Sequence, residues 1–75
     1  MGVTLYPVDS SMISHVGHDA ETRTLTILFQ SGKRYEYSGV PPEVYEELRT
    51  ANSPGSYFRE EIDGNYPHRQ GRGRR

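Results

Sequence analysis

The first half of the chain alternates apolar and polar residues, a pattern typical of β-strands that bury one face. Three segments show it: 12–18, 24–30 and 34–38. Polar connections of hairpin length, 19–22 and 31–33, separate these segments. The pattern therefore predicts a three-stranded antiparallel sheet. A four-stranded sheet is the alternative, with residues 1–9 as an edge strand, because Pro7 is unsuited to a central position.

A side-chain period of two assigns the residues of each strand to opposite faces. In 24–30 the apolar face consists of Leu25, Ile27 and Phe29. Leu28 breaks the polar character of the other face, so we expect that face to be partly covered. In 12–18 the same rule separates Val16 from Ile13. In 34–38 one face holds Tyr35 and Tyr37, and the other holds Arg34 and Glu36.

The second half changes to a helical pattern after a corner at 39–42. Pro42 is well suited to be the first helical residue. The N–H that proline lacks would have no hydrogen-bond partner within the helix at that position. A stripe with helical spacing follows: Val44, Tyr45, Leu48 and Ala51. A second short helix is predicted from an N-cap at Ser56 to about Asp63. The predicted fold class is α+β, with both helices packed on one face of the sheet.

Composition limits the size of the core. Leu, Ile, Val and Phe make up only 14 of the 75 residues, whereas six Tyr and two Phe provide eight aromatic rings. Aromatic residues must therefore supply much of the buried surface. The chain has no Cys, which excludes disulfides, thiolate metal sites and a Cys nucleophile. No apolar run is long enough to cross a membrane, and we expect a cytoplasmic protein without membrane contact.

The net charge of −1 conceals an asymmetry along the chain. The last seven residues carry four arginines: Arg69, Arg72, Arg74 and Arg75. The preceding residues 1–68 hold five Lys or Arg against ten Asp or Glu. We predict one domain over 1–67, with its core at about 9–67, followed by a flexible Arg/Gly-rich tail over 68–75.

An ordered set of motifs resembles the KTSC domain, the lysyl-tRNA synthetase C-terminal domain. The matching residues are Ser10-Ser11, Leu25, Phe29, Ser31-Gly32, Tyr35-Glu36-Tyr37, Val40-Pro41-Pro42, Ala51, Ser53, Gly55, Tyr57-Phe58, Ile62 and Tyr66. The resemblance implies a small bacterial or phage domain of this size, found alone or at the end of some lysyl-tRNA synthetases. RNA binding has been suggested for such domains. The resemblance supplies no catalytic residues and no cofactor.

Tyr35 and Tyr37 are the candidate residues for stacking on unpaired bases, since RNA-binding sheets present aromatic rings in this way. The competing interpretation is that both rings belong to the core, which the composition favours. Lys33 and Arg34 are candidate phosphate contacts, although Glu36 beside them is equally typical of a solvent-exposed, salt-bridged face. The tail arginines Arg69, Arg72, Arg74 and Arg75 are further candidate phosphate contacts.

Two classes of non-catalytic function therefore compete. The first is a module that binds single-stranded RNA or another nucleic acid. The second is a protein-interaction module that uses a sheet edge or the acidic helix face of Glu43, Glu46 and Glu47. An enzyme is not predicted, because no nucleophile elbow or phosphate loop is present. A metal site is not predicted either, because His15 and His18 fall on opposite faces of a strand.

Overall fold

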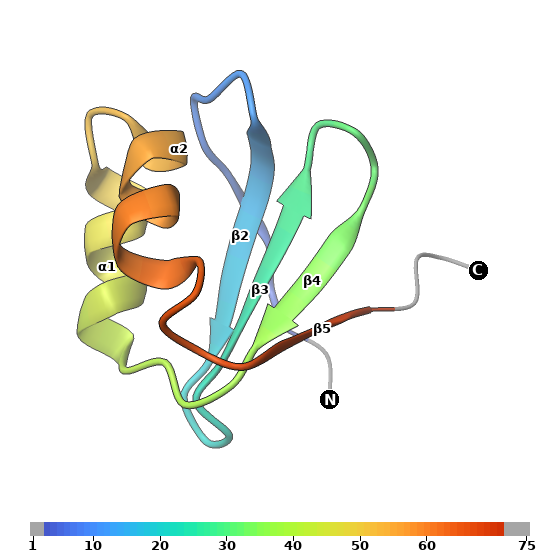
Figure 1. The fold of residues 1–75 in the computed structure, drawn as a ribbon, viewed down its shortest axis with the longest axis vertical. Helices are drawn as coiled ribbons and strands as arrows, with labels where there is room; N and C mark the ends of the chain where they lie inside the picture. Colours follow the sequence, from blue (N-terminus) through green and yellow to red (C-terminus); the bar gives the residue numbers. More distant parts are fainter. Residues whose placement is uncertain (1–2, 72–75) are drawn as a thin grey trace.

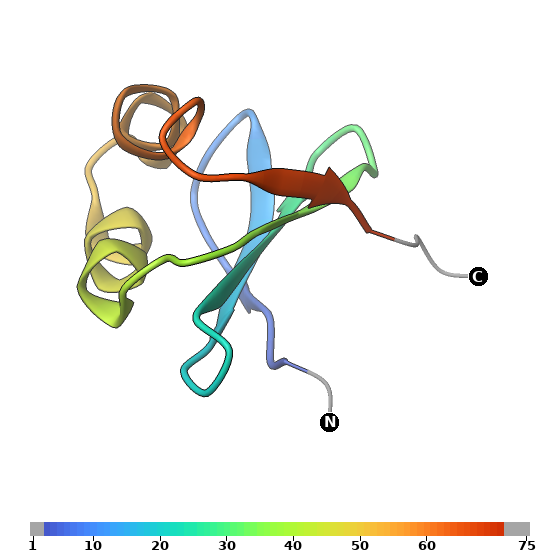
Figure 2. The ribbon, with the colours of Figure 1, turned by 60° about the horizontal axis from the view of Figure 1, so that its bottom comes forward.

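Across residues 3–71, five antiparallel strands form one sheet, and a helical hairpin covers one of its faces (Figures 1 and 2). The computed structural model describes residues 3–71. The strands are β1 (Tyr6–Pro7), β2 (Ile13–Asp19), β3 (Thr24–Phe29), β4 (Arg34–Tyr37) and β5 (His68–Gln70). They lie in chain order, and the helices are inserted between β4 and β5. The α+β class is confirmed, but the sheet has five strands where three or four were predicted.

A β-bulge in β2 corrects the predicted assignment of its faces. Ile13 pairs with Phe29, and the next pair joins His15 to Leu28, so Ser14 is the extra residue. The extra residue brings Ile13 and Val16 to the same face, where both are fully buried. Strict alternation had placed these two residues on opposite faces. The alternation rule fails here because it assumes one residue per ladder position.

The side of the sheet away from the helices is partly covered, as Leu28 led us to expect. The N-terminal arm passes closely over Gly17 of β2, and a Cβ built there would lie 2.5 Å from the carbonyl oxygen of Thr4. The same Cβ would lie 2.9 Å from Cδ2 of Leu5. Thr26 is only 2% exposed on this side. The missing side chain of Gly17 therefore makes room for the arm.

The core lies between the sheet and the helices, and aromatic rings are a large part of it. Its buried residues are Ile13, Val16, Leu25, Ile27, Tyr37, Val40, Tyr45, Leu48, Phe58 and Ile62. Partly buried residues packed against them include Phe29, Tyr35, Tyr57 and Tyr66. Seven of the eight aromatic rings thus pack in or against the core, and Tyr6 is the exposed one.

The first helix, α1 (Pro42–Thr50), begins at the predicted proline. Its apolar stripe is directed to the core through Tyr45 and Leu48. The corner before it is held by two long-range hydrogen bonds. The Val40 N–H donates to the Arg23 carbonyl at 2.9 Å, and Nε2 of His18 contacts the Val40 carbonyl at 2.7 Å. These bonds attach the end of the sheet to the start of the helix.

The second helix begins earlier than predicted. It starts as α2 (Pro54–Tyr57), with Ser53 and not Ser56 at the N-cap position. Pro54 sets the start because its fixed φ suits the first helical position. The helix continues as the π-helical turn η1 (Phe58–Ile62), in which the Asp63 N–H donates to the Phe58 carbonyl at 2.8 Å. Phe58 and Ile62 both point into the core.

The predicted flexible tail is partly ordered, because His68–Gln70 forms the edge strand β5. It pairs with β4 in the register Tyr35 to Gln70, Glu36 to Arg69 and Tyr37 to His68. The segment has no apolar anchor, so composition alone indicated disorder. Backbone pairing with β4 supplies the order instead. Arg72, Arg74 and Arg75 lie outside the described residues. Within residues 3–71, no helix is long and apolar enough to span a membrane.

Burial of the Tyr37 hydroxyl makes the stability of this core decrease at alkaline pH. It raises the pKa of the Tyr37 hydroxyl from 10.0 to about 12, and the nearby charge of Asp63 adds to the rise. The folded state therefore holds this proton more tightly than the unfolded chain. The stabilisation is complete below the unfolded pKa and is lost as pH rises through the folded one.

We expect the contribution of Tyr37 to the free energy of unfolding to fall by up to roughly 3 kcal/mol between about pH 10 and pH 12. Urea unfolding across this window measures the decrease. Burial and the hydrogen bond to Glu47 also raise the pKa of Tyr57 to about 12, so this residue contributes to the same decrease. Tyr37→Phe should make the pH dependence shallower without removing it. An unchanged slope in that variant would contradict the assignment to Tyr37.

Candidate nucleic-acid interface

The two tyrosines of β4 share a face of the sheet, as predicted, but they lie at different depths. Tyr37 is only 1% exposed, and its ring meets Phe58 edge-on with centroids 5.6 Å apart. Tyr35 is half-buried, and its ring meets Phe29 edge-on at 5.6 Å. The helical hairpin therefore covers Tyr37 and leaves part of Tyr35 accessible. Tyr35 alone of the pair can offer ring surface to a ligand in this conformation.

An open cleft of about 470 Å³ lies beside Tyr35 on the helix side of the sheet. Aromatic residues form much of its lining, and Lys33 and Asp63 add one charge of each sign. The complete lining is Ser11, Met12, Phe29, Gln30, Ser31, Lys33, Tyr35, Tyr37, Phe58, Asp63 and His68. We call this the aromatic cleft. Its aromatic rings, together with a few polar groups, are typical of a site that takes a flat organic ring.

His68 of β5 packs flat against the tyrosines of β4. Its ring is 5.4 Å from that of Tyr35, with an angle of 8° between the planes. It is 5.1 Å from Tyr37, at 29°. Sequence reasoning missed this residue because the strand that carries it was assigned to the flexible tail. No apolar and polar alternation marks this strand, since His68, Arg69 and Gln70 are all polar.

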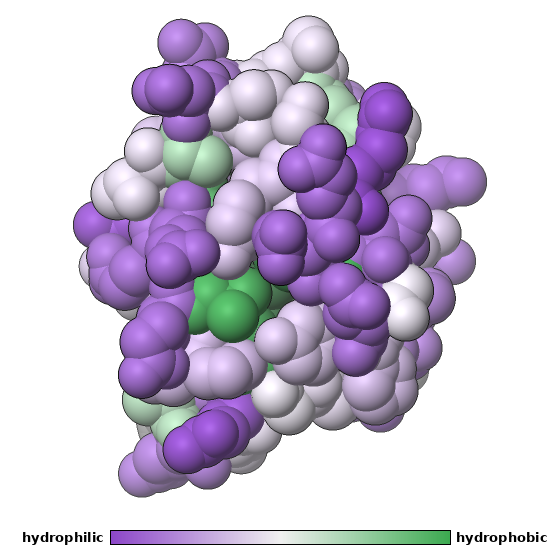
Figure 3. Space-filling model, turned by 60° about the vertical axis from the view of Figure 1, so that its left-hand side comes forward, coloured by the Kyte–Doolittle hydropathy of each residue, from purple (hydrophilic) through white to green (hydrophobic). Residues whose placement is uncertain are grey.

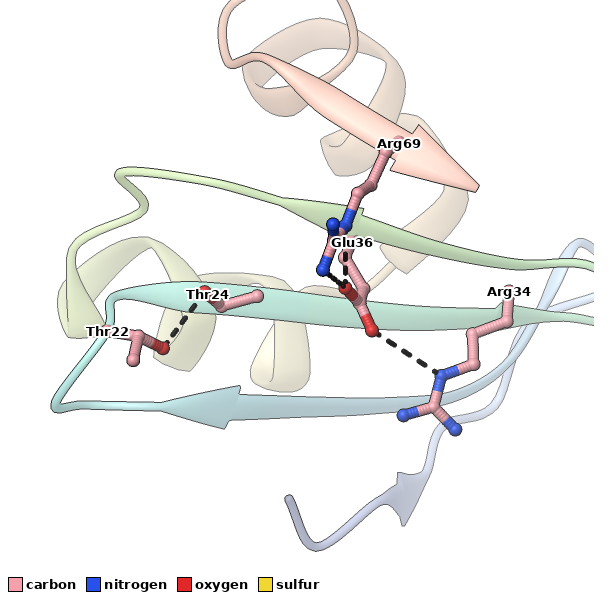
Figure 4. A network of polar contacts seen from close by, with 5 residues as sticks. All are labelled: Thr22, Thr24, Arg34, Glu36 and Arg69. Carbon is pink, nitrogen blue, oxygen red and sulfur yellow. Dashed lines mark hydrogen bonds and ion pairs between the residues drawn. The ribbon is translucent and has the colours of Figure 1, made fainter. Parts of the chain in front are cut away.

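The predicted cationic residues are divided between the two faces of the sheet. Lys33 lines the aromatic cleft, whereas Arg34 lies on the opposite face, away from the helices. There Nε of Arg34 is 4.0 Å from Oε2 of Glu36, and Nη2 of Arg69 is 3.2 Å from Oε1 of the same carboxylate. Figure 4 shows both arginines reaching Glu36 from different sides. The structure thus brings Lys33 to the tyrosines and separates Arg34 and Arg69 from them.

The acidic residues proposed for protein recognition lie on α1, and two of them have partners. Glu46 is 4.0 Å from the Arg49 guanidinium. Glu47 accepts a hydrogen bond from the Tyr57 hydroxyl at 2.9 Å. Figure 3 shows this side of the molecule, which is mostly hydrophilic and has its most strongly hydrophobic area, a small one, near the centre. Among residues 3–71, no three His, Asp or Glu side chains are grouped as metal ligands.

Comparisons with known proteins point to one family. The model of the KTSC domain matches residues 9–66. The chain is 42% identical over 62 residues to the lysine–tRNA ligase of Nostoc punctiforme, which is 83% of this chain and 11% of the ligase. It is 41% identical over 51 residues to an uncharacterized protein of Stutzerimonas stutzeri, covering 68% of this chain and 72% of that protein.

A solved structure has the same fold. The crystal structure of a KTSC domain protein from Yersinia pestis matches with a TM-score of 0.91 and 32% identity. The match covers 95% of this chain and all of that one. The chain is therefore similar in extent to the Yersinia domain, and it spans 11% of the length of the ligase.

Proposed function

The chain belongs to the KTSC domain family, as its motifs indicated, and we propose that it is a non-catalytic module that binds single-stranded RNA through the aromatic cleft. The observation that carries the proposal is the half-buried Tyr35 ring at an open cleft next to Lys33. A base stacked in the cleft would meet aromatic rings, and its phosphate would lie within reach of an ammonium group. The buried ring of Tyr37 packs behind the cleft and does not contact the base.

The size and shape of the cleft suit a nucleobase. Its volume of about 470 Å³ lies within the range of small-molecule clefts. His68 already packs a flat heteroaromatic ring against Tyr35, nearly parallel to it. An unpaired base is also a flat heteroaromatic ring, so it can stack in the same orientation, either beside His68 or in its place. Stacking of this kind depends little on sequence, because every base has a flat π-face.

The relatives add support of a different kind. The ligases matched here are named for their action on tRNA, and this chain matches 11% of the length of one of them. A domain of this family within an enzyme that handles tRNA is consistent with RNA contact. The activity of the ligase itself is not proposed for this chain.

We expect Tyr35→Leu to weaken binding of a labelled single-stranded RNA about tenfold, because base–aromatic stacking is worth about 1–3 kcal/mol per base. Leucine preserves apolar contact with Phe29 and removes the flat ring. Fluorescence anisotropy with a mixed-sequence RNA at ~50 mM salt measures the change. Tyr6→Leu is the matched control, because Tyr6 is the exposed tyrosine and lies outside the cleft.

A second variant ends at Gly71, so it lacks the terminal arginines and keeps β5 complete. It distinguishes RNA binding by the cleft from RNA binding by those arginines. If Tyr35→Leu binds as well as the unmodified chain, the cleft is not the RNA site. If the full chain does not bind RNA at low salt, the proposal fails as a whole. The protein-interaction alternative then becomes the leading function, to be tested by partner capture after nuclease treatment.

A further inference from the structure

We propose that Arg34, Glu36 and Arg69 form a phosphate-binding site on the face of the sheet opposite the helices, and that the Glu36 carboxylate occupies the phosphate position in the free protein. We call these three residues the arginine cluster. The inference extends the proposed function, and rests on it only in taking the phosphate to be that of an RNA backbone. It is independent of base stacking in the aromatic cleft.

Strand register brings the three side chains together. Arg34 and Glu36 are two residues apart in β4 and therefore share a face. Glu36 pairs directly with Arg69 of β5. Two nitrogens of Arg69 approach the same oxygen of Glu36, since Nε and Nη2 are both 3.2 Å from Oε1. The other oxygen, Oε2, is 4.0 Å from Nε of Arg34. One carboxylate is thus shared by two guanidinium groups (Figure 4).

The cluster carries one positive charge more than its carboxylate neutralises. Each guanidinium has five N–H donors, and a carboxylate cannot saturate two of them. The Arg69 side chain is 82% exposed, so most of its surface faces solvent. The phosphate of an RNA backbone has two non-bridging oxygens, as a carboxylate has, and accepts bidentate bonds from arginine. It can therefore take the place of the Glu36 carboxylate between the two guanidinium groups.

The surroundings are polar and open. A hollow of about 500 Å³ on one side of the cluster is also lined by Gln70 and Gly71. Another of about 320 Å³ reaches toward Thr22 and Thr24, whose hydroxyls lie 2.9 Å apart, and its lining also includes the Asp19 carboxylate. Hydroxyl groups commonly accompany arginine in contacts to phosphate oxygens. The cluster therefore has space for an anion and additional donors beside it.

Glu36 adds to the negative charge that opposes phosphate binding in this acidic domain. Residues 1–68 carry five more acidic than basic side chains, which opposes binding of a polyanion. Within the cluster Glu36 competes directly with an incoming phosphate for the same donors. Removing its charge should consequently strengthen phosphate binding, although most substitutions at a binding site weaken it.

The test is a titration of ¹⁵N-labelled full chain with inorganic pyrophosphate, observed at the arginine Nε–Hε signals. We expect the signals of Arg34 and Arg69 to shift, and Glu36→Gln to bind roughly two to five times more tightly, since exposed ion pairs are worth about 0.2–1 kcal/mol. Glutamine preserves an acceptor oxygen for Arg69, which favours retention of the fold. Glu60→Gln is the matched control, because it removes the same charge from an exposed position on η1.

Pyrophosphate affinity that is equal in the unmodified chain and in Glu36→Gln overturns the inference, as does the absence of shifts at Arg34 and Arg69. If Glu36→Gln perturbs the backbone amide signals broadly, Arg69→Gln replaces it, and this variant should bind pyrophosphate more weakly than the unmodified chain. An unchanged affinity in that case also overturns the inference.

RNA titrations separate this inference from the proposed function. With both intact, Glu36→Gln should bind RNA more tightly and with a salt slope steeper by about 0.7 for each additional phosphate held. Pyrophosphate binding without RNA binding supports the cluster and rejects the proposed function. RNA binding that depends on Tyr35, without shifts at Arg34 and Arg69, supports the proposed function and rejects the cluster.

Discussion

Replacement of Tyr37 by alanine is expected to lower the free energy of unfolding by about 3–5 kcal/mol, the usual cost of removing a buried aromatic ring. The ring is 1% exposed and lies against Phe58, Tyr35 and His68. A domain of this length has a total stability of only about 4–11 kcal/mol. The expected loss is therefore a large share of the total stability of the domain. Urea unfolding followed by circular dichroism measures the loss.

The chain offers two controls for this experiment. Tyr37→Phe retains the ring, so it should cost about 1 kcal/mol or less. Tyr6→Ala removes a ring that is 45% exposed, and it should change stability by no more than about 0.5 kcal/mol. A cost below about 1 kcal/mol for Tyr37→Ala would mean that this ring does not support the core. That outcome would return Tyr37 to the set of candidate base-stacking residues.

Gly17→Ala is expected to displace the N-terminal arm from the face of the sheet opposite the helices. The added Cβ would lie 2.5 Å from the Thr4 carbonyl oxygen, and a backbone atom cannot move aside as a flexible side chain can. Overpacking of this kind costs about 1–3 kcal/mol. Because Tyr6 and Pro7 pair with Val16 and His15, the displacement should also weaken the β1–β2 ladder. Faster hydrogen exchange of the Val16 and Tyr6 amides would report it.

Gly55→Ala provides the matched control for this substitution. A Cβ at that position has its nearest neighbour at 3.5 Å, an ordinary van der Waals contact. Alanine is also a better helix former than glycine, so stability should stay the same or rise by up to about 1 kcal/mol. If Gly17→Ala exchanges and unfolds like this control, the arm is not held closely against β2.

Local patterns in the sequence predicted the elements that local forces determine. The alternation from Thr24 to Phe29 identified β3, and Pro42 identified the start of α1, because both effects act over a few residues. The bulge at Ser14 left no such pattern, since it depends on how two strands pair. β5 left none either, because His68–Gln70 is ordered by pairing with β4 and not by its own composition.

The sequence predicted only part of the candidate site, because local patterns do not show which strands pair. A period of two correctly placed Tyr35 and Tyr37 on one face and Arg34 and Glu36 on the other. It could not give the depth of each ring, which depends on how far the helical hairpin covers β4. It also could not predict that His68 and Arg69 lie beside β4. The residues of both candidate sites that sequence reasoning misplaced are therefore those contributed by the last strand.

The position of β5 also has a consequence for the order of folding. Short turns join β2 to β3 and β3 to β4, so these pairings close small loops and cost little chain entropy. Pairing of Tyr35 with Gln70 must instead close a loop that contains both helices. We expect β5 to dock after the remaining sheet has formed and to detach first in local unfolding. Because His68 and Arg69 both belong to β5, a single docking step completes the aromatic cleft and the arginine cluster together.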